Sequence, residues 1–244
     1  MGVIGHLGPS AAPRIMRASL LDVARSHTLR CDPKQSEQRF RDFDAWIGGV
    51  SHWTLGERLP NPIMKGAQPD YLDSLDESGI PVISTMAVQN LSIDTAACRR
   101  VAEPDYGAHD VRKPQIGDVL LTVDGGPSIG KPALFELDGD WAVDSHVAIL
   151  RPAGVDPSLL VYLLASPLGQ IQLQRAESGA SGQTAVTEDD LRRFVFPELT
   201  PAVAEEALAK VHTAQYEADR LRAQAAATQD AGWEEFLSTC APGL

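Results

Sequence analysis

Short apolar runs, separated by turns rich in glycine and proline, make up most of the chain before residue 200. The clearest pattern spans residues 117–135 (GDVLLTVDGGPSIGKPALF), where an apolar run enters a loop with three glycines and a second run leaves it. Buried-strand patterns on both sides of a Gly-rich turn predict a β-hairpin. The same β-rich pattern recurs in residues 80–94, 141–152 and 192–199.

Helix-start signals lie between these runs. Asp156-Pro157 and Ser166-Pro167 each place a capping residue before a proline at the first helical position, ahead of PSLLVYLLAS and PLGQIQLQRAE. Residues 19–22 (SLLD) and 187–190 (TEDD) have the spacing of capping boxes. The segment SEQRFRDFDAWIGG carries three aromatic residues, which we expect to pack on the core rather than stack on bases.

The last element has a different pattern. Thr200 and Pro201 predict a helix start, and no further proline or glycine follows before Gly232. Alternating steps of three and four residues give a coiled-coil seam of mostly small side chains. The seam consists of Ala204, Ala207, Val211, Ala214, Ala218, Leu221 and Ala225. Residues 201–231 would span about 46 Å as a helix, longer than the globular part needs, so we expect it to pack on a second copy or on another protein.

These patterns predict an α+β fold, in which a β-rich domain with short helices precedes one long C-terminal coiled-coil helix. We expect a disordered tail over residues 1–13, the β-rich domain over 14–199, the helix over 200–237 and a tail over 238–244.

One motif suggests nucleotide binding, but its context excludes this function. Gly125 to Lys131 matches GxxxxGK, the start of a P-loop. The next position should be Ser or Thr to hold magnesium, and it is Pro132. A P-loop also opens a helix whose N–H groups bind phosphate, whereas KPALFEL is a strand pattern. We expect no NTPase activity.

Composition narrows the class of protein. The chain has 244 residues, a net charge of −12 and 43% hydrophobic residues, which is enough for a core. No apolar run approaches the roughly 20 residues of a membrane span, and the N-terminus lacks the basic start of a signal peptide. The three cysteines are far apart and predict no disulfide or metal site. We expect a cytoplasmic protein.

Charge alone does not decide whether the chain binds nucleic acid. The net acidity argues against it, but residues 13–41 contain seven basic and three acidic residues, whereas residues 201–244 contain three basic and seven acidic ones. Solvated faces on an acidic protein explain this distribution equally well.

Enzyme hypotheses have weak support. Ser145 and His146 are neighbours within a β-rich run, where adjacent side chains point to opposite faces and cannot exchange a proton directly. Asn61-Pro62-Ile63-Met64 differs from the Asn-Pro-Pro-aromatic signature of amino-methyltransferases, and no glycine-rich cofactor loop accompanies it. We expect no catalytic residues.

Taken in order, several stretches resemble a target recognition domain from the specificity subunits of type I restriction–modification systems. GIPVISTMAVQNLSID is similar to the family's entry strands, and GDVLLTVDGGPSIGKPALF to its hairpin. DSHVAILRP resembles the strand that ends in Arg-Pro, and YLLASPLGQIQLQ followed by SGQTAVTEDDLRRFVFPEL resembles the end of the domain. The helix from residue 201 is similar to the spacer helix. The match covers residues 50–237, and its strength lies in the order of the motifs.

The resemblance implies a subunit that recognises double-stranded DNA while catalysis resides in its partners. Family members have two recognition domains and two spacer helices, but this chain has one of each. The resemblance therefore implies that two copies of this chain form a homodimer through the helix. Such a dimer would recognise a gapped, pseudo-palindromic DNA site. The implied partner is an adenine-specific DNA methyltransferase subunit, which holds the S-adenosylmethionine and in some systems is joined by an ATP-driven nuclease subunit. No cofactor or metal is expected in this chain.

Within this resemblance, short polar side chains on loops are expected to contact base edges, and basic side chains phosphates. The expected base-contacting surface comprises Thr85, Ser128, Lys131, Ser145, His146, Ser181, Gln183 and Thr184. The expected phosphate contacts are Lys65, Arg99, Arg100, Lys113 and Arg175. The alternative is a scaffold or regulatory subunit of another DNA-defence complex, built on the same domain.

Overall fold

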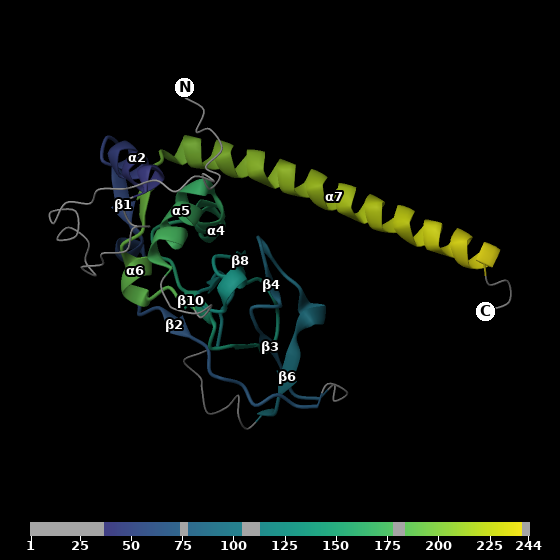
Figure 1. Cartoon of the computed structure of the whole chain (residues 1–244). Coiled ribbons are helices and arrows are strands. Elements are labelled where there is room, and N and C mark those ends of the chain that lie inside the picture. The colour runs from purple at the N-terminus through teal and green to yellow at the C-terminus, as the bar shows by residue number, and fades with distance from the viewer. Residues whose placement is uncertain (1–36, 74–77, 104–112, 178–183, 241–244) are drawn as a thin grey trace. The chain divides into compact units, whose positions relative to one another are not determined.

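The computed structural model describes residues 37–73, 78–103, 113–177 and 184–240. The chain divides into two compact units, residues 1–198 and residues 199–244 (Figure 1). Short strands and helices make up the described part of the first unit, and a single long helix makes up that of the second, so the predicted α+β architecture is confirmed. The expected N-terminal tail and the helix expected after Ser19 lie outside the described residues.

The central sheet has four antiparallel strands in the order β2-β10-β7-β8. They are β2 (Met64–Lys65), β7 (Val119–Thr122), β8 (Pro132–Leu134) and β10 (Val147–Leu150). Every residue of β7 and β10 is buried, which explains their uninterrupted apolar sequences. Strands β7 and β8 pair antiparallel, which confirms the predicted hairpin. The sheet tolerates Pro132 because it opens a strand at the sheet edge.

A second sheet has three strands in the order β6-β3-β9 and packs against the central sheet. It consists of β3 (Ile80–Ile83), β6 (Arg99–Val101) and β9 (Ala142–Val143), with β3 and β9 parallel. A small hairpin joins β4 (Val88–Gln89) to β5 (Ser92–Ile93), and a 3-10 turn follows over Thr95–Ala97. Buried side chains from both sheets share one apolar cluster, including Ile83, Leu120 and Ile149.

The first and the last strand in the described part of the first unit form a two-stranded sheet. β1 (His52–Thr54) pairs with β11 (Val195–Pro197), and a 3-10 turn follows β1 over Leu55–Arg58. Helix α2 (Gln38–Ile47) buries Phe40 and Phe43 against Ile171, which confirms the expected packing of these two aromatic residues. Trp46, the third, is 41% exposed.

Three further helices begin at the predicted residues. They are α4 (Pro157–Ala165), α5 (Pro167–Ala176) and α6 (Glu188–Arg192). The Asp156 carboxylate accepts the N–H of Leu159 at 3.0 Å, and the Ser166 hydroxyl accepts that of Leu168 at 3.2 Å. The capping box of Thr187 and Asp190 is also present. Local capping chemistry therefore set these helix starts.

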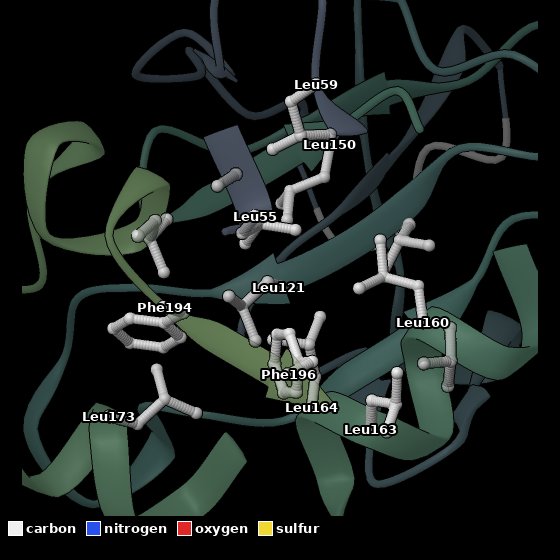
Figure 2. Close-up of a cluster of buried hydrophobic side chains, with 14 of the residues drawn as sticks. Leu55, Leu59, Leu121, Leu150, Leu160, Leu163, Leu164, Leu173, Phe194 and Phe196 are labelled. Carbon is white, nitrogen blue, oxygen red and sulfur yellow. The ribbon is translucent and has the colours of Figure 1, made fainter. Parts of the chain in front are cut away.

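The largest apolar cluster lies between the central sheet, the β1–β11 pair and the helices (Figure 2). Leu121 of β7 and Leu150 of β10 pack with Phe196 of β11 and with Leu160 and Leu164 of α4. All five side chains are almost completely buried. Each contributes about 1.5–3 kcal/mol of hydrophobic free energy, so this cluster fixes the platform from which the loops emerge.

Helix α7 (Pro201–Cys240) makes up the described part of the second unit. It continues through Gly232 and beyond, which corrects the expected extent of 201–231 and the expected end at residue 237. A single glycine costs only about 1 kcal/mol relative to alanine within a helix, which the flanking helix formers outweigh. None of its side chains is buried, and Trp233, Phe236 and Leu237 near its end are each about half exposed. No helix in the described part of the chain is long and apolar enough to cross a membrane.

Candidate nucleic-acid interface

A buried threonine holds the loop of the β7–β8 hairpin in shape. Thr122 is fully buried, and its hydroxyl donates to the carbonyl oxygen of Ser128 and accepts the N–H of Lys131 at 2.9 Å. Gly125 and Gly130 have φ angles of +101° and +88°, in the left-handed region that favours glycine. The loop continues into strand β8 and not into a helix, so it lacks the structural context of a P-loop.

Lys131 ties this loop to the one that follows β3. Its ammonium group donates to the carbonyl oxygen of Thr85 at 2.8 Å. Burial lowers the pKa of Lys131. A Cβ atom placed on Gly125 would lie 3.9 Å from the Thr85 methyl group, so the two loops are in contact. Lys131, which is itself an expected DNA contact, thus holds the backbone of Thr85 in place.

Ser145 and His146 form a turn between β9 and β10, which corrects the expectation that they lie within one strand. The reason is Asp144, whose buried carboxylate accepts the His146 N–H at 2.8 Å and the Tyr71 hydroxyl at 3.1 Å. An aspartate that accepts the N–H two residues later closes an Asx turn. Ser145 donates to the side-chain oxygen of Gln68 at 3.1 Å.

The turn and the hairpin loop are joined to each other. The Val123 N–H donates to the His146 carbonyl oxygen at 3.0 Å, and Nδ1 of His146 lies 3.6 Å from a carboxylate oxygen of Asp124. This nitrogen is shielded from solvent, while the His146 side chain as a whole is 44% exposed. Ser145 thus donates to Gln68, while Nδ1 of His146 approaches Asp124 without a hydrogen bond, which does not favour a Ser–His catalytic pair.

The structure therefore brings five of the expected base-contacting residues together. We call this set the loop cluster, and it consists of Thr85, Ser128, Lys131, Ser145 and His146. Thr184 lies beside the loop cluster, because the next residue, Ala185, forms an antiparallel β-bridge with Asp124. The Thr184 hydroxyl donates to the Glu177 carboxylate at 2.6 Å. Ser181 and Gln183 lie outside the described residues.

The expected phosphate contacts are more scattered. Arg99 stacks over the ring of Tyr71, with its guanidinium carbon 4.1 Å from the ring centroid. Because Tyr71 donates to Asp144, the residue before Ser145, Arg99 lies next to the loop cluster. Arg100 donates to the Gly79 carbonyl oxygen at 2.7 Å. Arg175 forms a bidentate pair with Asp44 of α2 at 2.7 and 2.9 Å. Lys65 is exposed on β2, and Lys113 is half-buried before β7.

Sequence analysis missed four residues that shape the loop cluster, namely Gln68, Tyr71, Asp124 and Asp144. Only Asp144 had a local signal. The carboxylate of an aspartate can accept the N–H two residues later, which is typical of an Asx turn. The other three reach the cluster through contacts that are distant in sequence.

Tyr71 gives a pH-dependent prediction. Its hydrogen bond to the Asp144 carboxylate should contribute about 1.5–3 kcal/mol, which Tyr71→Phe should remove from the free energy of unfolding. Burial and the neighbouring Asp144 raise the pKa of Tyr71 above its ordinary value. The contribution is then fully present below the unfolded-state pKa of about 10, and it is lost as the pH rises through the higher folded-state value.

Urea denaturation of wild type and Tyr71→Phe near pH 8 and near pH 11 tests this prediction. The difference between the two proteins should shrink at the higher pH. Tyr216→Phe on the exposed surface of α7 is the control. A difference that stays constant between the two pH values would contradict the proposed role of the phenol proton.

The chain matches no protein-family model and no curated protein. It is similar to several chains of solved structures, among them the following three. The first is a chain in a structure of the type I R-M system, with 20% identity, a TM-score of 0.47 and coverage of 79% of this chain and 50% of that one. The second is the HsdS subunit from Thermoanaerobacter tengcongensis, with 18% identity, a TM-score of 0.49 and coverage of 84% and 50%. The third is a type I restriction–modification S subunit from M. genitalium, with 12% identity, a TM-score of 0.48 and coverage of 71% and 41%. This chain spans half or less of the length of each.

Proposed function

We propose that this chain is the DNA-sequence-recognition subunit of a type I-like restriction–modification or methyltransferase complex. It directs a separate adenine-specific methyltransferase to its site and has no catalytic activity of its own. Two copies pair through α7 and recognise a gapped, pseudo-palindromic sequence. The methyltransferase holds S-adenosylmethionine, and a nuclease subunit joins the complex in systems that cut DNA. The complex acts in the cytoplasm.

One observation carries this proposal. Three motifs that are far apart in sequence, around Thr85, around Lys131 and around Ser145, converge on one polar loop cluster above a rigid sheet. Loops on a rigid scaffold are where proteins place binding residues. Serine and threonine hydroxyls and lysine ammonium groups hydrogen-bond to base edges in the major groove, where each base pair has a distinct pattern.

The net charge of −12 bears on how the chain binds. Phosphate contacts dominate the affinity of proteins for DNA, and the expected ones are few and partly engaged within the protein. We therefore expect weak binding by the isolated chain and strong binding by its complex with the methyltransferase.

The same acidity favours the second candidate function, a scaffold subunit that no longer binds DNA. Affinity purification from the native host distinguishes the two candidates. Recovery of an adenine methyltransferase would support the recognition subunit. Recovery of other proteins without such a methyltransferase would support the scaffold.

Genome-wide mapping of methyladenine, with and without this chain, is the direct test of the proposed function. We expect one gapped motif to lose methylation when the chain is deleted and to regain it on complementation. An unchanged pattern of methylation in the deletion strain would contradict the proposal.

Lys65 provides a test of the expected phosphate contacts. Lys65→Ala in the complex should weaken binding to target and scrambled duplexes by a similar factor. Loss of one phosphate contact should also reduce the slope of log affinity against log salt by about 0.9. Lys210→Ala, which removes an exposed lysine of α7, is the matched control. Titrations at several salt concentrations give the slopes, and an unchanged slope for Lys65→Ala would exclude this lysine from the phosphate contacts.

A further inference from the structure

Gln68 occupies a defined place beside the loop cluster, although no sequence motif includes it. A close approach of two backbones puts it there. A Cβ atom on Gly66 would lie 1.6 Å from the Val143 carbonyl oxygen, so only glycine fits at this position. Ala67 then forms a parallel bridge with Asp144, and Gln68 comes next in the chain.

Ser145 orients the Gln68 side chain. Its hydroxyl donates to the Gln68 side-chain oxygen at 3.1 Å. Ser145 is itself held by the turn that the buried Asp144 closes. Gln68 is exposed, so its side-chain amide reaches solvent while its oxygen accepts the Ser145 hydroxyl.

We propose that Gln68 contacts the major-groove edge of an adenine in the DNA site, with Ser145 as its positioning residue. This inference rests on the proposed function of the chain. The side-chain NH2 donates to N7 of the base, and the side-chain oxygen, which has a second lone pair beyond the one used by Ser145, accepts from N6. In a two-fold dimer the contact occurs once in each half-site.

The neighbouring residues fit this arrangement. Lys65, three positions earlier in the same segment, is exposed and basic, as expected for a residue that contacts the backbone flanking the base. The carboxylate of Asp144, next to Ser145, is buried and already accepts two hydrogen bonds within 3.1 Å. The exposed group that Ser145 contacts is the neutral amide of Gln68, which suits a base edge better than a phosphate.

Selection of sites from randomised duplex DNA by the complex with its methyltransferase tests the inference. Wild type should select a motif with adenine at one position of each half-site. Gln68→Ala should reduce the preference for that adenine by about 5- to 150-fold, while all other positions of the motif are retained. Ser145→Ala should reduce the preference at the same position to a smaller extent.

Gln68→Glu gives a second readout in a side chain of the same size. A carboxylate accepts from N4 of cytosine, so the preferred base at that position should change from adenine to cytosine. Gln38→Ala, which removes an exposed glutamine on α2, is the matched control and should leave every position unchanged.

The outcomes separate this inference from the proposed function. A wild-type complex that selects no motif would contradict the proposed function itself. A wild-type complex with a clear motif that Gln68→Ala and Gln68→Glu both leave unchanged would overturn the inference alone. A change at a position where wild type prefers another base would overturn the assignment to adenine.

Discussion

Replacing Arg151 with methionine is expected to lower the free energy of unfolding by about 3–5 kcal/mol, the cost typical of leaving one member of a buried ion pair without its partner. The Arg151 guanidinium forms a bidentate contact with the Asp118 carboxylate, at 2.8 and 2.7 Å. Asp118 is only 2% exposed, and this contact raises the pKa of Arg151. Without Arg151, the buried carboxylate would keep the Gln115 N–H but lose its counter-charge.

The location of the pair explains its importance. Asp118 stands immediately before β7 and Arg151 immediately after β10, the two central strands of the main sheet. The GD and RP positions of the motifs found in the sequence are therefore two halves of one interaction. Strand pairing brings Asp118 and Arg151 together, since Val119 lies opposite Leu150.

The chain offers a matched control at its surface. Arg175 and Asp44 form a contact of the same bidentate geometry, but Asp44 is 50% exposed. Asp44→Ala should cost no more than about 1 kcal/mol. Urea denaturation of both variants compares the two pairs directly, and equal losses would show that burial of Asp118 does not decide the stability of its pair.

Ala214→Arg is expected to raise the dissociation constant of the proposed dimer at least about 1,000-fold. Ala214 lies in the middle of the seam of small residues on α7, where a large side chain would separate the helices and bury an unpaired charge. The substitution occurs in both copies of a two-fold dimer, so each copy contributes to the loss. At about 1.4 kcal/mol per tenfold change, a loss of about 4 kcal/mol gives this factor.

Ala209→Arg is the control, because residue 209 lies half a helical turn away from the seam and is exposed. Sedimentation analysis of wild type and both variants gives the dissociation constants. We expect Ala209→Arg to associate as wild type does. A wild-type chain that stays monomeric at high concentration would refute the homodimer and leave a different protein as the partner of α7.

The exposed end of α7 carries a second apolar patch, which lies outside the heptad positions of the seam. Trp233 and Phe236 are in edge-to-face contact, with ring centroids 5.8 Å apart, and Leu237 lies four residues after Trp233. Spacings of three and four residues put these side chains on one face of the helix. The seam predicted from the sequence ends at Ala225 and does not include these residues.

The loops of this protein show where sequence analysis was sufficient and where it was not. The β7–β8 hairpin and the helix starts at Asp156, Ser166 and Thr187 were all predicted. The turn at Ser145 and His146 was not, because apolar residues flank it closely and its cause is a hydrogen bond to the neighbouring Asp144. Gly66 gave no warning of its role either, since the backbone that it must approach is 77 residues later at Val143.

The sequence by itself determined the β7–β8 hairpin, the starts of α4, α5 and α6 and the long helix α7, because strand patterns, capping residues and seam spacing are local chemistry that acts within a few residues. Only the tertiary structure decided which side chains meet. It pairs Lys131 with Thr85, Ser145 with Gln68 and Arg151 with Asp118 through sheet pairing across long stretches of chain. Contacts of this kind depend on register and on close backbone approach, which no local pattern specifies.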